Sequence, residues 1–209
     1  MKQIYVHGLG QTAASWESVL CRLEKPDECI CPDLAGMIPA GEAATYQALY
    51  KAFMELCDSL EGPLDLCGLS LGGVLALHYA SEHPERVHSL VLIAPQYRMP
   101  KGLLRMQNIL FRFFPKAAFS QVGFTKSQFI QLCGSMMDLD LSEGLSGITC
   151  PTLVLCGSRD RANKQACVQL AQRLKWAELQ IVDDAGHEIN REAPEQLAAL
   201  LCNFYSKIP

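Results

Sequence analysis

The sequence lacks a long apolar run, since no stretch approaches the roughly 20 apolar residues needed to span a bilayer. Its first residues carry no long apolar region and no small-residue cleavage site, so we predict a strand there and not a signal peptide. Charge is also scarce: charged residues make up 19%, and the net charge of −4 gives no reason to expect nucleic-acid binding. Apolar residues make up 49%, which favours one globular domain over a disordered chain.

Metal-binding patterns are absent too. The ten cysteines include no CxxC pair and no cysteine–histidine cluster with zinc spacing. Cys29, Cys31, Cys67 and Cys156 lie in apolar runs that are typical of buried strands, where a free thiol behaves as a small hydrophobe. We therefore expect reduced cysteines, a cytoplasmic protein, and a function that requires neither a metal nor a cofactor.

Six short apolar runs alternate with helical patterns along the chain. Such runs are typical of strands that are buried on both faces of a parallel sheet. Their alternation with helices predicts an α/β fold, with helices on both faces of a six-stranded parallel sheet. The runs cover 3–6, 28–31, 64–67, 89–94, 152–156 and 179–182, and the helical patterns cover 13–23, 44–60, 71–83, 163–174 and 194–205.

Segment 96–147 interrupts this alternation, because it contains no clear strand. A connection of that length usually carries structure of its own or a function. We predict a helical cap over 96–147, inserted into one α/β domain whose two parts are 1–95 and 148–209. We also expect the 28–31 run to form an exposed sheet edge, where a second copy could pair, so the protein is expected to be a monomer or a dimer.

The segment Gly68-Leu69-Ser70-Leu71-Gly72 follows one apolar run and opens a helical pattern. A serine at a tight strand-to-helix turn is held in a strained conformation, with its hydroxyl exposed, and the glycines let neighbouring backbone pass. The N–H groups that begin the helix point toward the site, where they can stabilise an oxyanion. We predict that Ser70 is a nucleophile.

A histidine and an aspartate follow the last two apolar runs. His187 comes after the sixth run and could take the serine proton as a general base. Asp160 comes after the fifth run, and a carboxylate there could fix the histidine tautomer. The chain order is then Ser, Asp, His. Asp183 and Asp184 are competing candidates for the acid, because they lie close to His187 in sequence.

The motif His7-Gly8-Leu9-Gly10 closes the first apolar run. Its glycines would allow the loop to approach the site closely, so the backbone N–H groups of Leu9 and Leu71 are predicted to form the oxyanion hole.

These motifs together resemble the α/β-hydrolase superfamily, and in particular its small single-domain esterases, enol-lactonases and C–C-bond hydrolases. The resemblance covers nearly the whole chain and implies the same triad and oxyanion hole. One departure concerns the loop after Gly36, which runs Met37-Ile38-Pro39-Ala40, and another is Asn163, where the family often has proline. Further motifs that carry the resemblance are Ser15-Trp16, Pro32-Asp33-Leu34, His83-Pro84-Glu85-Arg86-Val87, Pro151-Thr152-Leu153-Val154-Leu155, Gly186-His187 and Pro194-Glu195.

Three functions are compatible with this predicted fold and triad. The leading one is hydrolysis of a small-molecule carboxylic ester or thioester through an acyl-serine intermediate. A C–C-bond hydrolase or lyase would use the same serine–histidine pair on a carbon acid or ketone. A hydrolase-like binding or signalling protein could retain the triad as well, because a fold does not fix a function. A panel of activated esters of different chain length separates the first two functions.

The predicted cap is rich in basic residues. Between Gln96 and Met137 there are six basic residues and no Asp or Glu. At about 100° per residue, Lys101, Arg105 and Arg112 lie within about 40° of one another on a helix. This face is either an ordinary solvated surface, or it attracts an anionic carrier, an anionic substrate or an acidic membrane surface. Residues predicted to line an apolar substrate pocket are Trp16, Leu110, Phe113 and Phe114.

If the basic face attracts an anionic partner, the effect is electrostatic and is screened by salt. We then expect kcat/KM for an anionic substrate to fall at high salt and in the variant Lys101→Glu/Arg105→Glu, whereas a neutral short ester should respond little. Steady-state kinetics at low and high salt measure both effects. Equal responses of the two substrates would show that the face is only a solvated surface.

Overall fold

The computed structural model of the chain describes residues 1–39, 41–111, 113–115, 119 and 123–208, without the side chains of 27, 103, 106, 107 and 110. In this part of the chain one sheet has six parallel strands in the order β2-β1-β3-β4-β5-β6. This confirms the predicted parallel sheet. The strands are β1 (Lys2–Val6), β2 (Cys29–Ile30), β3 (Leu64–Leu69), β4 (Val87–Ile93), β5 (Thr152–Gly157) and β6 (Ala177–Val182).

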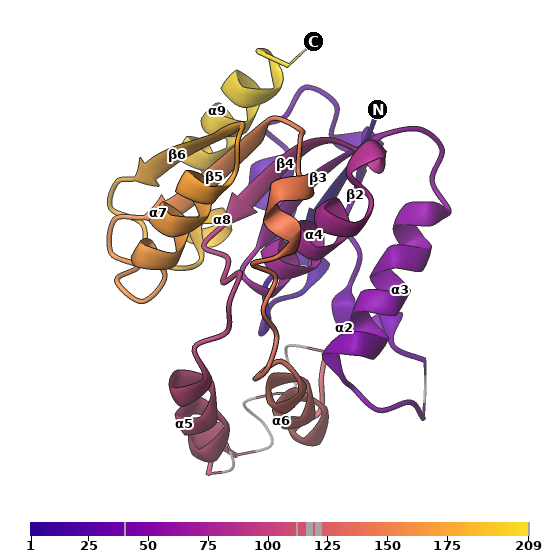
Figure 1. The fold of residues 1–209 in the computed structure, drawn as a ribbon, viewed down its shortest axis with the longest axis vertical. Helices are drawn as coiled ribbons and strands as arrows, with labels where there is room; N and C mark the ends of the chain where they lie inside the picture. Colours follow the sequence, from indigo (N-terminus) through magenta and orange to yellow (C-terminus); the bar gives the residue numbers. More distant parts are fainter. Residues whose placement is uncertain (40, 112, 116–118, 120–122, 209) are drawn as a thin grey trace.

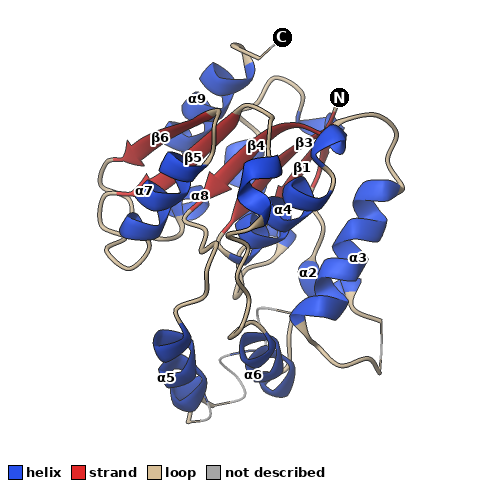
Figure 2. Ribbon diagram, in the orientation of Figure 1, coloured by secondary structure: helices blue, strands red, loops and turns tan. Residues whose placement is uncertain are grey.

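Helices cover both faces of this sheet (Figure 1). One face carries α3 (Tyr46–Asp58), α4 (Leu71–Glu82) and α7 (Lys164–Arg173), and the other carries α1 (Glu17–Leu20), α8 (Ile189–Glu192) and α9 (Pro194–Tyr205). Figure 2 shows the strands as a layer between the two sets of helices. Short helical segments are η1 (Ala13–Trp16), η2 (Pro26–Glu28), α2 (Leu34–Met37), η3 (Pro84–Arg86) and η5 (Gly144–Gly147).

The strand sequences explain the two hydrophobic cores. Successive side chains of a strand point to opposite faces, and all six residues of β3 are buried. Leu64 and Leu66 therefore pack beneath α3 and α4, while Cys67 and Leu69 pack beneath α1 and α9. A strand that is apolar on both faces can lie only in the interior of the sheet, and β3 lies between β1 and β4.

Strand β2 forms one edge of the sheet, as we predicted for the 28–31 run. It has only two residues, Cys29 and Ile30, which pair with Gln3 and Ile4 of β1. A very short edge strand offers few unpaired backbone groups to a second chain. Dimerisation at this edge stays a prediction.

Helices α5 (Lys101–Phe111) and α6 (Lys126–Ser135) lie apart from the sheet at the bottom of Figure 1, and α6 is the nearer of the two to α2 and α3. The ring of Phe111 packs edge-to-face on Phe129 at 5.0 Å, which joins the two helices. Ser135 Oγ accepts a hydrogen bond from the Tyr46 N–H at 2.7 Å, and this bond ties α6 to α3. The 96–147 segment thus contains helices, and its assignment as a cap stays a prediction. No helix in the described ranges is both long and apolar enough to cross a membrane.

The packing of Phe53 on α3 generates a stability prediction. Phe53 is fully buried and its ring meets Tyr79 edge-to-face at 6.2 Å. Phe53→Ala should lower the free energy of unfolding by about 3–5 kcal/mol, because it removes buried apolar area and leaves a cavity. Urea unfolding measures the loss. The matched control is Phe113→Ala, since Phe113 is 81% exposed and its truncation should change little; equal losses would contradict this assignment of the core.

Candidate active site

Ser70 joins β3 to α4 in a strained backbone conformation, with φ 50° and ψ −112°. Positive φ is uncommon for a residue other than glycine, and it persists only where surrounding contacts hold it. Here the Ser70 N–H donates to the carbonyl of Ile93 at 2.8 Å, and the Ser70 carbonyl accepts from the Val74 N–H at 2.9 Å. The turn therefore places a partly exposed serine at the carboxyl end of β3.

The two glycines that flank Ser70 are required by close backbone packing. A Cβ at Gly68 would lie 2.3 Å from the carbonyl oxygen of Gly72. A Cβ at Gly72 would lie 2.2 Å from the carbonyl oxygen of Val6, at the end of β1. Neither position can accept a side chain without moving backbone, which is the physical reason for the G-x-S-x-G spacing.

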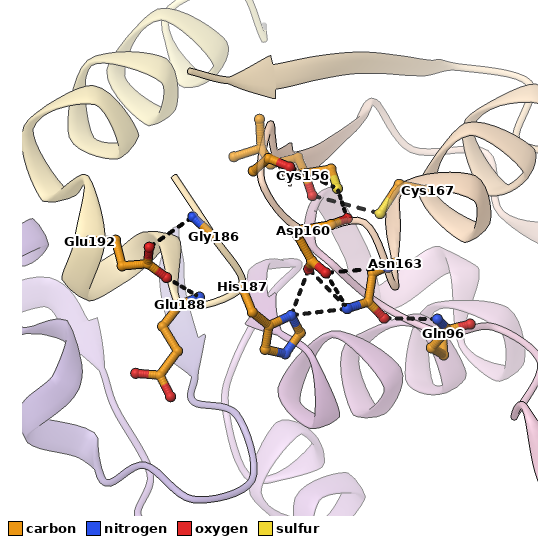
Figure 3. Close-up of polar contacts among 11 residues, drawn as sticks. Gln96, Cys156, Asp160, Asn163, Cys167, Gly186, His187, Glu188 and Glu192 are labelled. Carbon is orange, nitrogen blue, oxygen red and sulfur yellow. Dashed lines mark hydrogen bonds and ion pairs between the residues drawn. The ribbon is translucent and has the colours of Figure 1, made fainter. Parts of the chain in front are cut away.

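Asp160 and His187 meet through a hydrogen bond. His187 Nδ1 lies 2.7 Å from Asp160 Oδ2, and the Asp160 side chain is only 4% exposed (Figure 3). Because the carboxylate can only accept, Nδ1 carries the proton and Nε2 is left able to accept another. Among the described residues, the side chains of Asp183 and Asp184 make no hydrogen bond or ion pair with His187, so Asp160 is the carboxylate paired with it.

This pair shifts the titration of both partners. The hydrogen bond to Asp160 raises the pKa of His187 above its ordinary value, although burial of the ring opposes the shift. Burial acts to raise the pKa of Asp160, but hydrogen bonds from His187 and Asn163 outweigh it and hold the pKa below its usual range. The pair is thus arranged to stabilise a charged imidazolium.

Two further residues support the pair, and the sequence analysis did not assign a role to either. Asn163 donates from Nδ2 to both carboxylate oxygens of Asp160, at 2.9 Å each. Glu192 accepts the N–H groups of Gly186 at 2.8 Å and Glu188 at 3.1 Å, one on each side of His187. The spacing of Asn163 from Asp160 was a signal for the first residue. No local pattern pointed to Glu192.

The loop after β1 is fixed by His7, which is fully buried. The Leu34 N–H donates to His7 Nε2 at 3.1 Å, so the Nδ1–H must be the group that donates to the Gly8 carbonyl at 2.9 Å. Burial lowers the pKa of His7, in agreement with a neutral ring. This histidine therefore has a structural role, and both of its nitrogens are used.

The same loop lies against the serine turn. A Cβ at Gly8 would be 3.5 Å from the Cβ of Ser70. Leu9 follows directly, and Leu71 is the first residue of α4, whose opening N–H groups have no acceptor within the helix. Their assignment as an oxyanion hole stays a prediction. Ser70 and His187 are not hydrogen-bonded to each other in the described residues, and such contacts often tighten only when substrate binds.

The predicted pocket residues occupy different surroundings. Trp16 is fully buried and packs edge-to-face on Tyr5 at 5.3 Å, within the core beneath α1 and α9. Phe113 is 81% exposed and Phe114 is 48% exposed, while the side chain of Leu110 lies outside the described residues. Helical spacing predicts which residues share a face of a helix, but it does not reveal whether that face packs against the protein or points into solvent. An apolar roof from these residues stays a prediction.

The predicted basic face is partly neutralised. Lys101 Nζ lies 2.6 Å from Asp138 Oδ1, and Arg98 Nε lies 3.2 Å from Asp140 Oδ2. Both aspartates come just after 96–137, the interval that contains no Asp or Glu. A count of charges within that interval therefore overstates the positive potential at this surface. Lys126 Nζ donates to the Phe114 carbonyl at 2.6 Å. Arg112 and Lys116 lie outside the described residues.

A cavity of about 400 Å³ lies at the other end of the sheet. Its lining includes Gln3, Asp65 and His88, from the amino-terminal parts of β1, β3 and β4. Ligands of open α/β sheets bind beyond the carboxyl ends of the strands. Ser70, Asp160 and His187 all lie at those carboxyl ends, so this cavity is separate from the candidate site.

Comparison with known proteins decides the family. The model of the alpha/beta hydrolase family matches residues 4–200, nearly the whole chain. The chain belongs to the α/β-hydrolase family. This confirms the resemblance that the sequence motifs indicated.

Relatives of this hydrolase include lipases and esterases. The monoacylglycerol lipase abhd6-B of Xenopus laevis is 22% identical over 253 residues, covering 98% of this chain and 75% of the relative. A pimeloyl-acyl-carrier-protein methyl ester esterase of Neisseria meningitidis is 27% identical over 170 residues, covering 76% of this chain and 62% of the relative. The enol-lactonase of Burkholderia xenovorans has the same fold, with a TM-score of 0.85 at 20% identity, covering 99% of this chain and 92% of that one.

The hydrogen bond between Asp160 and His187 generates a pH prediction. In Asp160→Asn the pKa of His187 should fall, since the carboxylate partner that raises it is replaced by a neutral amide. NMR titration of the His187 ring measures this pKa. The matched control is Asp183→Asn, because Asp183 lies closer in sequence but is not paired with the ring; an equal fall in both variants would contradict the assignment.

The same pair should affect stability with a defined sign. His187 has a raised pKa, so its stabilisation is complete below the ordinary value of 6.5 and is lost as pH rises through the raised pKa. Asp160 has a lowered pKa, so its stabilisation is present above 3.8 and is lost as pH falls through the lowered pKa. The difference in unfolding free energy between wild type and Asp160→Asn should therefore be largest between pH 3.8 and 6.5, and it should shrink as the pH rises through the raised pKa of His187.

Proposed function

We propose that the protein is a serine hydrolase that cleaves a carboxylic ester or thioester through an acyl-serine intermediate. Ser70 is the nucleophile, His187 the general base and Asp160 the acid. The observation that supports this proposal best is the strained Ser70 turn at the end of β3, together with the hydrogen-bonded Asp160–His187 pair after β5 and β6. Parallel strands bring these three loops to one edge of the sheet.

The first half of the reaction forms the acyl-enzyme. Ser70 Oγ attacks the carbonyl carbon while His187 Nε2 takes the hydroxyl proton, and Asp160 stabilises the resulting imidazolium. As negative charge develops on the carbonyl oxygen, that oxygen accepts hydrogen bonds from the backbone N–H groups of Leu9 and Leu71. The tetrahedral intermediate then collapses, the bond to the alcohol or thiol breaks, and His187 gives its proton to the leaving group.

The second half releases the acid. A water molecule gives a proton to His187 Nε2 and attacks the acyl carbon, and the bond to Ser70 Oγ then breaks. The proton returns from His187 to Ser70, so the enzyme is restored. Both halves begin with a neutral His187, and activity should therefore rise with pH through the raised pKa of this residue.

The choice of an ester or thioester over a C–C bond is supported by two relatives. The proteins from Xenopus laevis and Neisseria meningitidis are named as a lipase and as a methyl ester esterase. The identity of the acyl group is a separate question, which an ester chain-length series addresses directly.

The nucleophile can be tested by covalent labelling. A fluorophosphonate probe should label wild type at Ser70 alone and should not label Ser70→Ala, while Ser127→Ala, an exposed serine on α6, should be labelled like wild type. Ser70→Ala and His187→Ala should each lower kcat for an activated ester by several orders of magnitude, and the double variant should lose little more, because triad members act as a unit. Labelling at another serine, or additive losses, would refute the mechanism.

A further inference from the structure

Asn163 lies against both members of the Asp160–His187 pair (Figure 3). Its Nδ2 is 2.9 Å from Asp160 Oδ1, 2.9 Å from Asp160 Oδ2 and 3.1 Å from His187 Nδ1. Its backbone N–H also donates to Asp160 Oδ1, at 3.3 Å. Because His187 Nδ1 already donates to the carboxylate, the approach of Nδ2 to Nδ1 is a contact between two donors that share one acceptor.

The orientation of the Asn163 amide is fixed by its partners. A carboxylate can only accept hydrogen bonds, so the amide nitrogen and not the oxygen must face Asp160. Asn163 Oδ1 then points the other way and accepts from Gln96 Nε2 at 2.8 Å. Turning the amide over would place its oxygen 2.9 Å from both carboxylate oxygens, which is repulsive. The hydrogen bonds therefore run from Gln96 to Asn163 and from Asn163 to Asp160.

Asn163 does not cap the helix that follows it, although asparagine commonly does so at this position. Asn163 is the residue that precedes helix α7, where an asparagine side chain commonly accepts an N–H from the first turn of the helix. Here the side chain makes no such bond, and both of its polar atoms are used by Asp160 and Gln96. The Asn163 side chain therefore does not cap the helix, and its amide donates to the Asp160 carboxylate instead.

Gln96 brings a further strand into the network. It follows β4, and the intervening Ala94 has a positive φ of 48°. Asp160 and Asn163 follow β5, and His187 follows β6. The hydrogen bonds from Gln96 to Asn163, from Asn163 to Asp160 and from His187 to Asp160 therefore join three neighbouring strand ends, and the Asn163 amide approaches the carboxylate beside the His187 ring.

We propose that Asn163 is a positioning residue for Asp160, and that Gln96 holds Asn163 in the required orientation. This inference rests on the proposed function. The torsion that turns a carboxylate about its own axis is broad, so the bond from His187 and the longer bond from the Asn163 backbone N–H leave Asp160 room to turn. Donation from Asn163 to both oxygens stops that rotation and stabilises the anion. Oδ2 then stays directed at Nδ1 while His187 gains and loses its proton.

The experiment compares Asn163→Ala, Gln96→Leu and their double variant with the control Gln165→Ala. Gln165 is exposed on the first turn of the same helix. Asn163→Ala should lower kcat by about 10- to 100-fold with KM nearly unchanged, because a misplaced group affects the transition state more than substrate binding. Gln96→Leu should lower kcat less, and the double variant should be no slower than Asn163→Ala, since Gln96 acts through Asn163.

The isosteric variant Asn163→Asp adds a pH readout. Its carboxylate would lie beside Asp160 and near His187, so the pKa of His187 should rise further. The acidic limb of kcat/KM against pH should move upward by the same amount, whereas it should stay in place in Gln165→Ala. This shift reports that position 163 faces the ring, and Asn163→Ala carries the distinction of role: a residue that only supports the loop would lower thermal stability in that variant without lowering the kcat of the folded enzyme.

The outcomes separate the inference from the proposed function. If the fluorophosphonate probe does not label Ser70 in wild type, the proposed function fails. If wild type is labelled but Asn163→Ala and Asn163→Asp retain the wild-type kcat and pH profile, the positioning role is overturned. It is also overturned if kcat falls only in proportion to the folded fraction, measured by thermal unfolding. A loss of kcat in folded Asn163→Ala, with no further loss in the double variant, supports it.

Discussion

Backbone packing around Ser70 is the constraint on which the site depends. The carbonyls of Val6 and Gly72 occupy the space that side chains at Gly72 and Gly68 would need. Strand β1, the serine turn and helix α4 are thereby pressed together, and the Ser70 backbone is held at a positive φ that it would not adopt alone. The same closeness brings the loop after β1 next to the serine. The strain is thus a consequence of packing, and the surrounding sheet maintains it.

Parallel strands supply the second requirement. Because β3, β4, β5 and β6 all run in one direction, the loops that follow them leave the sheet at the same edge. Ser70, Gln96, Asp160 and His187 come from those four loops, although more than a hundred residues separate the first from the last. A buried carboxylate is costly unless its oxygens are hydrogen-bonded, and Asp160 meets that condition with partners from the fifth and sixth strand loops.

The positive charge on the helical segment 96–147 is more fully paired than its composition suggested. The chain carries a local excess of basic residues over 96–137, yet Asp138 and Asp140 follow at once and pair with Lys101 and Arg98. Such exposed pairs contribute little to stability, but they reduce the field that a distant anion would meet. Any attraction for an anionic partner is therefore carried by fewer charges than the composition of that segment implies.

The sequence by itself determined the fold and the order of the chemical groups. Apolar runs and glycine spacing are local signals, because each depends on neighbouring residues only, and the order of Ser70, Asp160 and His187 is read directly along the chain. The tertiary structure decided which groups meet. Asp160 and not Asp183 pairs with His187, Trp16 packs in the core, and Asn163 faces a carboxylate instead of capping its helix. These outcomes depend on where separate loops converge, and short-range periodicity contains no information on distances across the sheet.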